Sequence, residues 1–368
     1  MMKMFMKSSG KAEIMKQKVV VGLSGGVDSS VAAYLLREKG YEVIGVTMLM
    51  WPQADEKGEI TEEPQSVVDA RKVAQHLDIP YHVLDFTKQF KKEVVDYFTS
   101  EYLKGRTPNP CNVCNRRIKW EALMDWAREH GAEYIATGHY ARIDRLENGR
   151  YAIRNSVTAQ KDQTYALYNL TQDQLAHTLL PVGEYSKDEI RRIALEQQLP
   201  VANKSDSQDI CFIPDGDYGA FLEKQIPDQI PGEGNFVSTE GKVLGRHKGV
   251  THYTIGQRKG LGIAMGHPVF VCEIRSETNE VVIGENEDIF SCDLICKDVN
   301  YMGMEEGKEP PRCIAKVRYA HKGDFCLFEK LPDGNLRVHF EKPVRAITPG
   351  QAVVFYDGEY VLGGGIIL

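Results

Sequence analysis

The sequence predicts an α/β protein in which a parallel sheet carries helices on both faces and is followed by a small β-rich central domain and a C-terminal β-barrel. Two observations carry this expectation. Up to about residue 138, short β-branched runs alternate with helical patterns, and such alternation is typical of a parallel sheet covered on both faces. From about residue 232, glycine-rich segments and short alternating runs separated by turn residues replace the helices, as in small β domains and barrels.

In the first part of the chain, the predicted elements follow one another with little interruption. The run "KVVVGL" is a short apolar strand, and the helix after it has Val31, Leu35 and Leu36 at helical spacing before Gly40 ends it. Strands are expected at 18–23, 41–49, 81–86 and 133–138, and helices at 29–40, 66–77, 88–105 and 116–131.

The segments after residue 140 break this alternation. Residues 141–155 are predicted to form a hairpin around Asn148 and Gly149, and two helices follow, each opened by a capping box. The boxes pair Thr171 with Gln174 and Ser186 with Glu189, and the runs 313–320 and 335–340 are expected strands of the barrel. We expect a flexible N-terminal extension (1–17), a first domain (18–215), a central domain (216–290) and a C-terminal β-barrel domain (291–368).

Composition limits the classes of protein to which the chain can belong. With 368 residues, of which 42% are hydrophobic and 26% charged, it is typical of a globular protein of about two or three domains. A net charge of −7 argues against nonspecific coating of nucleic acid, although a local basic groove is compatible with it. Eight cysteines are too few for a disulfide scaffold and favour a reducing cytoplasm, and no apolar run is long enough to span a membrane.

The segment "GLSGGVDSS", residues 22–30, joins the first strand to the first helix and is the candidate phosphate site. Gly25 and Gly26 allow the backbone to fold tightly around an anion, and the helix N-terminus supplies free N–H groups. The hydroxyls of Ser24, Ser29 and Ser30 can donate to phosphate, and Asp28 is a candidate Mg²⁺ ligand. The segment matches neither G-x-x-x-x-G-K-[ST] nor G-x-G-x-x-G, so a serine-capped turn without a ligand is the competing interpretation.

Cys111 and Cys114 stand in "TPNPCNVCNRR" at a spacing compatible with half a metal site, a redox disulfide or a single reactive thiol. We expect Cys114 at the start of the 116–131 helix, where the helix dipole, Arg116 and Arg117 would lower its pKa. Cys211 follows "SDSQDI" in a polar loop and is expected to be accessible. The other five lie in strand-like segments and are expected to be buried packing residues: Cys272, Cys292, Cys296, Cys313 and Cys326.

The motif "SGGVDS" after a first strand resembles the pyrophosphate loop of the N-type ATP pyrophosphatases, whose fold is adenine-nucleotide α-hydrolase-like. Members of that superfamily use ATP to adenylate an oxygen, release pyrophosphate, and displace AMP with a nucleophile. Five further segments, in order, resemble the bacterial tRNA-specific 2-thiouridylases: "GRTPNPCNVCN", "ATGHYAR", "KDQTYAL", "SDSQDICFI" and "THYTIGQRKGLGI".

This resemblance implies an ATP-dependent thiotransferase. The C2 oxygen of the wobble uridine in tRNA would be adenylated, and sulfur from a cysteine persulfide would replace it, giving 2-thiouridine, AMP and pyrophosphate. The implied cofactors are ATP and Mg²⁺. The implied partners are tRNAs of the Lys, Glu and Gln types and a cysteine desulfurase or sulfur-relay protein, for a cytoplasmic monomer that does not bind membranes.

The resemblance also assigns roles to residues. Cys114 matches the nucleophile, Cys211 the persulfide carrier, and Asp28 a third catalytic residue. The ATP-binding positions are Gly22, Leu23, Ser24, Gly25, Gly26, Val27, Asp28, Ser29, Met48 and Gly138. The tRNA-binding positions are Asn109, Pro110, Cys111, His139, Lys161, Asp162, Gln163, Arg318, Tyr319 and Gln351. A local basic face is expected from Lys242, Arg246, His247, Lys248, Arg258 and Lys259.

Three alternatives stay open at this point. The chain would be a pyrophosphate-loop ligase or amidase if its substrate were a small molecule. It would be a cluster-dependent tRNA thiolase if Cys111, Cys114 and Cys211 held an iron–sulfur cluster with one open iron. A nucleotide- or metal-sensing protein is the third alternative. A zinc ribbon is disfavoured, because the sequence has no second C-x-x-C pair.

Overall fold

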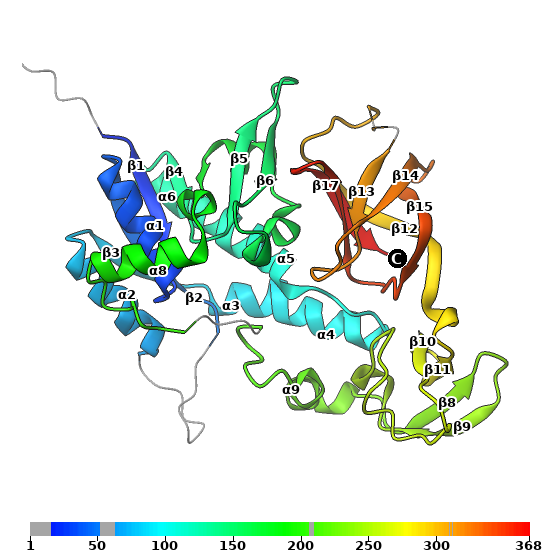
Figure 1. Cartoon of the computed structure of the whole chain (residues 1–368). Coiled ribbons are helices and arrows are strands. Elements are labelled where there is room, and N and C mark those ends of the chain that lie inside the picture. Colours follow the sequence, from blue (N-terminus) through cyan, green and yellow to red (C-terminus); the bar gives the residue numbers. More distant parts are fainter. Residues whose placement is uncertain (1–15, 52–62, 206–209, 309, 311) are drawn as a thin grey trace, which may run out of the picture.

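The structure is a computed structural model that describes residues 16–51, 63–205, 210–308, 310 and 312–368. Most of the expected extension 1–17, and residues 206–209 of the "SDSQDICFI" segment, lie outside the described residues. Figure 1 shows an α/β part at the left, a β-barrel at the upper right that contains the C-terminus, and a smaller sheet at the lower right. Within the described ranges, no helix combines the length and the apolar character needed to cross a membrane.

A five-stranded parallel sheet forms the centre of the α/β part. Its strands lie in the order β3-β2-β1-β4-β7, so the order reverses direction between β1 and β4. In open α/β sheets, ligands bind at the carboxyl ends of the strands beside such a reversal. The strands are β1 (Lys18–Gly22), β2 (Glu42–Leu49), β3 (Tyr81–Asp85), β4 (Tyr134–Ala136) and β7 (Thr178–Leu179).

Alternating side chains of β1 explain why helices cover both faces of this sheet. Val19 and Val21 are fully buried in a cluster with α1 (Val27–Glu38), α2 (Gln65–His76) and α8 (Lys187–Glu196). Val20 points the opposite way, into a cluster with η2 (Asn115–Ala122) and α6 (Leu123–Glu129). The predicted parallel sheet with helices on both faces is therefore confirmed.

The cysteine pair lies inside a helix that begins earlier than predicted. Helix α5 (Pro110–Cys114) starts at Pro110 and continues through η2 into α6. The Asn109 side chain accepts a hydrogen bond from the Cys111 N–H (3.0 Å), and Pro110 occupies the first turn, where its missing N–H costs nothing. The predicted start at residue 116 is wrong, because Asn109 caps a helix that begins at Pro110.

Two long helices contain π-helical segments. The first runs through α3 (Thr87–Phe90), η1 (Lys91–Val95) and α4 (Asp96–Leu103), and the second has η2 as its π-helical segment. A π segment rotates the residues after it relative to a regular α-helix, and such segments are frequent at functional sites. No pattern in the sequence predicted them.

The predicted hairpin forms, although it joins an unexpected sheet. Strands β5 (Ala141–Arg145) and β6 (Tyr151–Asn155) pair around a turn in which Gly149 has φ +81°. Strand β6 also pairs with β17 (Tyr360–Ile367), so the hairpin extends the C-terminal sheet. Both capping boxes are present, one at α7 (Gln172–Ala176) and one at α8.

The C-terminal strands close into the predicted barrel. They lie in the order β12-β15-β14-β13-β16-β17, and pairing between β12 and β17 closes the sheet. The further strands are β12 (Phe290–Tyr301), β13 (Cys313–Lys316), β14 (Asp324–Lys330), β15 (Leu336–Arg345) and β16 (Ala352–Asp357).

The central part is smaller and begins with helix α9 (Tyr218–Gln225). Its four strands lie in the order β10-β11-β8-β9, and only β11 and β8 are parallel within that sheet. The strands are β8 (Gly234–Ser238), β9 (Val243–His247), β10 (Phe270–Arg275) and β11 (Glu280–Gly284). The short 3₁₀ turns are η3 (Ala159–Lys161), η4 (Thr164–Leu167), η5 (Pro181–Glu184), η6 (Pro227–Gln229), η7 (Val250–His252) and η8 (Glu287–Ile289).

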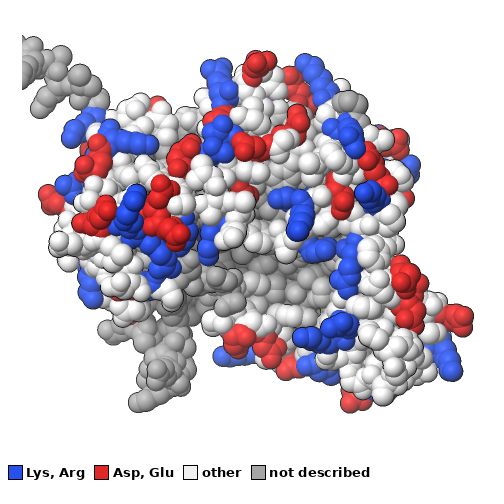
Figure 2. All heavy atoms as spheres, in the orientation of Figure 1, with Lys and Arg blue, Asp and Glu red and all other residues white. Residues whose placement is uncertain are grey.

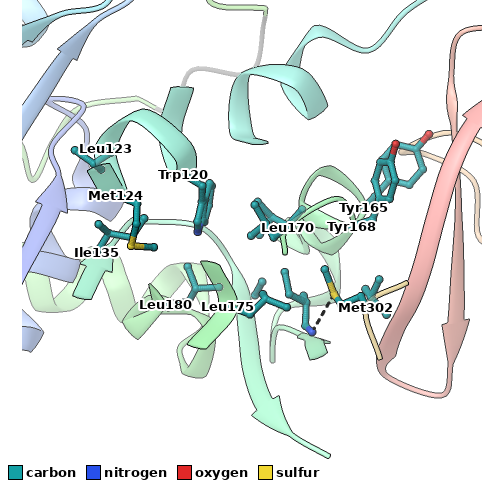
Figure 3. Packing of buried hydrophobic residues seen from close by; sticks show 14 of the residues in the cluster. Trp120, Leu123, Met124, Ile135, Tyr165, Tyr168, Leu170, Leu175, Leu180 and Met302 are labelled. Carbon is teal, nitrogen blue, oxygen red and sulfur yellow. Dashed lines mark hydrogen bonds between the residues drawn. The ribbon is translucent and has the colours of Figure 1, made fainter. Parts of the chain in front are cut away.

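One hydrophobic core joins the α/β part to the barrel. Trp120 and Leu123 of the cysteine helix belong to the same buried cluster as Met302, which follows β12 (Figure 3). The backbone N–H of Ile153 on the hairpin also contacts the Met302 sulfur at 3.5 Å. This shared packing fixes the barrel beside the helix that carries the cysteines.

Candidate active site

The loop after β1 has the geometry of a phosphate site. Gly25 has φ +69°, and a Cβ at this position would lie 2.3 Å from the Ser66 carbonyl oxygen of α2. Only glycine fits there. Gly26 is the N-cap of α1 and no side chain caps that helix, so N–H groups of its first turn are available to an anion.

The serines of this loop differ in their hydrogen bonds and in their exposure. The Ser29 hydroxyl oxygen accepts from the Ser24 N–H (3.1 Å), and the Ser30 hydroxyl donates to the Gly26 carbonyl (2.7 Å). Ser29 and Ser30 are buried, whereas Ser24 is exposed. Ser29 and Ser30 therefore shape the loop, and Ser24 is the serine best placed to contact a ligand.

Met48 and Gly138 lie at the same carboxyl edge of the sheet as this loop. A Cβ on Gly22 would lie 3.3 Å from the Met48 methyl carbon, and a Cβ on Gly138 would lie 2.6 Å from the Ser29 nitrogen. The segment after β4 thus packs directly on the loop, and any side chain at Gly138 would displace it. The structure brings together all the predicted ATP-binding positions.

The Asp28 carboxylate is held by two residues that sequence reasoning missed. Lys187 Nζ lies 2.7 and 2.9 Å from its two oxygens, and the Tyr140 hydroxyl donates to it at 2.7 Å. The Lys187 side chain is only 12% exposed. No spacing in the sequence could have revealed these contacts, because the partners come from distant elements.

These residues fit Mg²⁺ only as an ion that arrives with a nucleotide. Among the residues that the structure describes, no group of three or more His, Cys, Asp or Glu side chains could hold a metal. Mg²⁺ usually binds one or two carboxylates together with substrate phosphates, and Asp28 at the phosphate loop meets that requirement.

Cys114 is buried, which contradicts the expected activation of its thiol. It is 5% exposed, and its sulfur lies 3.6 Å from the sulfur of Met50. Burial raises the pKa of Cys114 to about 12, and Lys119 opposes this only in part. The free N–H groups of a helix, which favour a thiolate, lie in its first turn. Because this helix begins at Pro110, Cys114 lies beyond that turn.

The three predicted cysteines share one neighbourhood. In addition to burial, the Cys211 and Cys111 thiols both raise the pKa of Cys114, whereas Lys119 lowers it. All three are free thiols, and Cys111 and Cys211 are exposed. Phe212, which follows Cys211, packs in the same cluster as Cys114. The cysteine helix and the distant Cys211 segment therefore meet.

His139 and Lys119 connect the cysteines to the phosphate loop. His139 follows Gly138, its Nδ1 lies 2.8 Å from the Thr137 hydroxyl, and its ring lies 5.3 Å from the Trp120 ring. Burial, helped by Lys119, holds the pKa of His139 well below its usual range, so the ring is neutral. Lys119 was not among the predicted site residues.

Gln351 of the barrel lies beside the segment that leads into the cysteine helix α5. Its side-chain amide donates to the Thr107 carbonyl at 2.7 Å, close to the predicted tRNA-binding residues Asn109 to Cys111. Residues far apart in the sequence thus come together at one junction of the barrel and the α/β part.

A second junction holds the other predicted tRNA positions. The Asp162 carboxylate accepts from the Ser156 N–H, and the Gln163 side-chain oxygen accepts from the Tyr140 N–H. These two side chains therefore shape the turn itself. Lys161 lies in the same turn, and Tyr319 is 53% exposed while its hydroxyl donates to the Asp162 carbonyl (2.9 Å).

Arg318, beside Tyr319, is anchored to the barrel. Its guanidinium donates to the Arg345 carbonyl at 2.8 Å, and burial lowers its pKa, with the nearby Arg345 adding to this effect. Arg318 thus keeps its side chain on the barrel side of the junction.

The predicted basic face needs one correction. His247 is buried at 3% exposure, and its Nδ1 accepts from the Gly249 N–H. Burial lowers its pKa, so it adds no charge to a surface. Lys242, Arg246, Lys248, Arg258 and Lys259 are exposed. Figure 2 shows Lys and Arg side chains along the hollow between the barrel and the central part.

The remaining cysteines follow the packing prediction only in part. Cys296, Cys313 and Cys326 are buried inside the barrel, whereas Cys272 and Cys292 are half-buried. Cys313 and Cys326 face each other across β13 and β14, with their sulfurs 3.6 Å apart.

Three family models match successive parts of the chain: the tRNA methyl transferase HUP domain over residues 17–215, the tRNA methyl transferase PRC-barrel domain over 219–285, and the Aminomethyltransferase beta-barrel domain over 291–367. The tRNA-specific 2-thiouridylase MnmA of Lachnoclostridium phytofermentans is 58% identical over 96% of this chain and 99% of its own length. The proteins of the same name from Clostridium acetobutylicum and Acetivibrio thermocellus are 55% and 52% identical over 96% of this chain. With such identity over nearly its whole length, the chain belongs to the tRNA-specific 2-thiouridylase family.

Proposed function

We propose that this protein is an ATP-dependent tRNA-specific 2-thiouridylase acting on the wobble uridine. The observation that carries the proposal is the placement of Cys114 against Met50. Met50 directly follows β2, whose carboxyl end also holds Met48 beside the phosphate loop. A sulfur site and a nucleotide site therefore share one edge of the sheet, as a reaction that adenylates and then thiolates one base requires.

The thiols also favour sulfur transfer over the methyl transfer named in two of the domain descriptions. Moving a methyl group needs neither a phosphate loop nor a group of free cysteines. Replacing oxygen by sulfur needs both, because the C2 oxygen of uridine leaves only after activation and the incoming sulfur must be carried to it.

In the first step, the C2 oxygen of the uridine attacks the α-phosphorus of ATP, and pyrophosphate leaves. The N-terminus of α1 and the loop Gly22–Ser29 stabilise the departing pyrophosphate, while Met48 and Gly138 border the adenosine. Mg²⁺, when bound with ATP, neutralises phosphate charge, and Asp28 is the residue that would hold it.

In the second step, Cys211 carries the sulfur as a persulfide. The Cys114 thiolate attacks the inner sulfur, the two cysteines form a disulfide, and the terminal sulfur leaves as hydrosulfide. That sulfur bonds to C2, and AMP departs with the electron pair of the broken carbon–oxygen bond. A thiol reductant then supplies two electrons to reopen the disulfide. Because Cys114 is buried with a raised pKa, its surroundings must change when RNA binds.

RNA binding is assigned to the two junctions between the barrel and the α/β part. Lys161 and Arg318 suit phosphate, and Tyr319 suits stacking on an unpaired base. The full proposed set is Asn109, Pro110, Cys111, His139, Lys161, Asp162, Gln163, Arg318, Tyr319 and Gln351. The base must leave its stack to reach Cys114.

The wider setting of this reaction is also part of the proposal. The protein acts in the cytoplasm as a monomer, on tRNAs of the Lys, Glu and Gln types. A cysteine desulfurase or sulfur-relay protein loads Cys211. The chain divides into an N-terminal extension and three domains, with boundaries after residues 17, 215 and 290.

The test uses purified protein, ATP, unmodified tRNA and a cysteine desulfurase with cysteine as the sulfur source, and 2-thiouridine is measured by mass spectrometry. Cys114→Ala and Cys211→Ala are expected to abolish the product, while Cys111→Ser keeps it. Normal thiolation by the Cys211 variant would overturn the proposal. Pyrophosphate release that depends on a small molecule and ignores tRNA would instead support a ligase, and activity that requires bound iron would support a cluster enzyme.

A further inference from the structure

Lys204 connects the phosphate loop to the segment of chain that leads to Cys211. Its Nζ donates to the Gly25 carbonyl at 3.0 Å and pairs with the Asp69 carboxylate of α2 at 2.7 Å. No local pattern could predict this contact, because Lys204 and Gly25 come from opposite ends of the α/β part.

The contact is well defined on the loop side. Gly25 is locked in a left-handed conformation against Ser66 of α2, so its carbonyl has a fixed direction. The Asp69 side chain is only 15% exposed. Burial would raise its pKa, but hydrogen bonds from Lys204 and Gln65 outweigh this and lower it. The carboxylate is therefore charged and holds the Lys204 ammonium group in place.

The same lysine restricts the position of the sulfur carrier. Lys204 and Cys211 are separated by about seven residues, which can span at most ~25 Å when extended. Cys211 therefore lies within that distance of a residue that contacts the phosphate loop. If the phosphate loop shifts on binding ATP, Lys204 shifts with it, because its ammonium group donates to the Gly25 carbonyl.

An enzyme with this chemistry must keep its two steps together. An adenylated uridine that meets no sulfur would react with water and consume ATP without product. We propose that Lys204 is a positioning residue that couples the occupied phosphate loop to the placement of Cys211. This inference rests on the proposed function and adds to it a residue that touches neither the reacting base nor, in this structure, the sulfur.

The experiment compares Lys204→Met with wild type in the full-length, persulfide-loaded protein, and counts the pyrophosphate released for each 2-thiouridine formed. Wild type is expected to release about one per product. In Lys204→Met the ratio is expected to rise at least about threefold, while the KM for ATP changes by less than about threefold. Lys204→Arg should restore the wild-type ratio, and Asp69→Asn should raise the ratio less than Lys204→Met does.

Lys72→Met is the matched control. Lys72 lies on α2, is exposed, and acts on the Asp69 pKa, but it makes no contact with Gly25. Its ratio should match wild type. A second readout does not depend on activity: mild oxidation should form the Cys114–Cys211 disulfide faster with an ATP analogue in wild type, and at a rate insensitive to the analogue in Lys204→Met.

Two results would overturn this inference while leaving the proposed function intact. One is an unchanged ratio in Lys204→Met. The other is a parallel loss of pyrophosphate release and thiolation, which would make Lys204 a phosphate-site residue instead. If wild type itself forms no 2-thiouridine, the proposed function fails, and the two failures are thereby distinguished.

Discussion

Burial decides the state of the catalytic thiols at the scale of single residues. Cys114 lies among Met50, Ile118 and Phe212, where charge is unfavourable and the thiol stays protonated. The motif and its spacing could be read from the sequence, and the pairing of Cys114 with Cys211 is an expectation from the family resemblance. The burial could not be predicted, because it depends on Phe212 and Met50, which come from other segments of the chain.

The first prediction concerns alkylation of the free enzyme. With a pKa of about 12, Cys114 has only about one thiolate in 10⁵ at pH 7, and this fraction grows as the pH rises toward 12. Exposed Cys111 should react with iodoacetamide at least about 100-fold faster at pH 7, as followed by peptide mass spectrometry. Equal rates for the two cysteines would show that Cys114 is accessible before RNA binds.

At the scale of elements, the sheet, the hairpin and both capping boxes were predictable because each depends on short-range patterns. Helix α5 was placed too late, since Asn109 and Pro110 form a cap that resembles a turn in sequence. The π segments and the lysines around the loop could not be predicted. Lys187 and Lys204 reach the loop because α8 and the segment that follows it pack in one cluster with β1 and α2, and this packing has no local signal.

The second prediction concerns the close approach of α2 to the phosphate loop. Gly25→Ala would place a methyl group 2.3 Å from the Ser66 carbonyl oxygen and strain a backbone at φ +69°. The loop must shift, so the KM for ATP should rise at least about tenfold, with a stability loss of about 1–3 kcal/mol in urea unfolding.

Gly40→Ala is the control for this change. Gly40 also has a positive φ, +89°, but a Cβ there meets nothing within 4 Å. It should lose about 1 kcal/mol of stability and keep its KM for ATP within about twofold. If the two variants had the same KM, the contact with Ser66 would be irrelevant to nucleotide binding.

At the scale of the whole molecule, contacts join the barrel and the α/β part into one body. The hairpin pairs with β17, Met302 belongs to the same buried cluster as Trp120, and the Gln351 side chain donates to the Thr107 carbonyl just before α5. The sequence indicated the separate parts by their composition. Their assembly was not predictable, because it depends on side chains more than a hundred residues apart.

The third prediction concerns the salt dependence of tRNA binding. Each phosphate contact adds about 0.7–0.9 to the slope of log Kd against log salt. Arg258→Ala with Lys259→Ala should lower that slope by about 1–2, because both side chains are exposed. His247→Gln should leave it unchanged, because this histidine is buried and neutral. A smaller slope in the His247 variant would contradict the placement of the basic face.

The central claim is that sulfur passes from Cys211 to the base and leaves a Cys114–Cys211 disulfide. A single turnover with isotopically labelled persulfide on the enzyme, ATP and unmodified tRNA tests it directly, with peptide mapping of the quenched protein. We predict the label in 2-thiouridine and the disulfide between Cys114 and Cys211, in equal amounts. Label in the tRNA with both cysteines left as free thiols, or with Cys111 in the disulfide, would contradict the account.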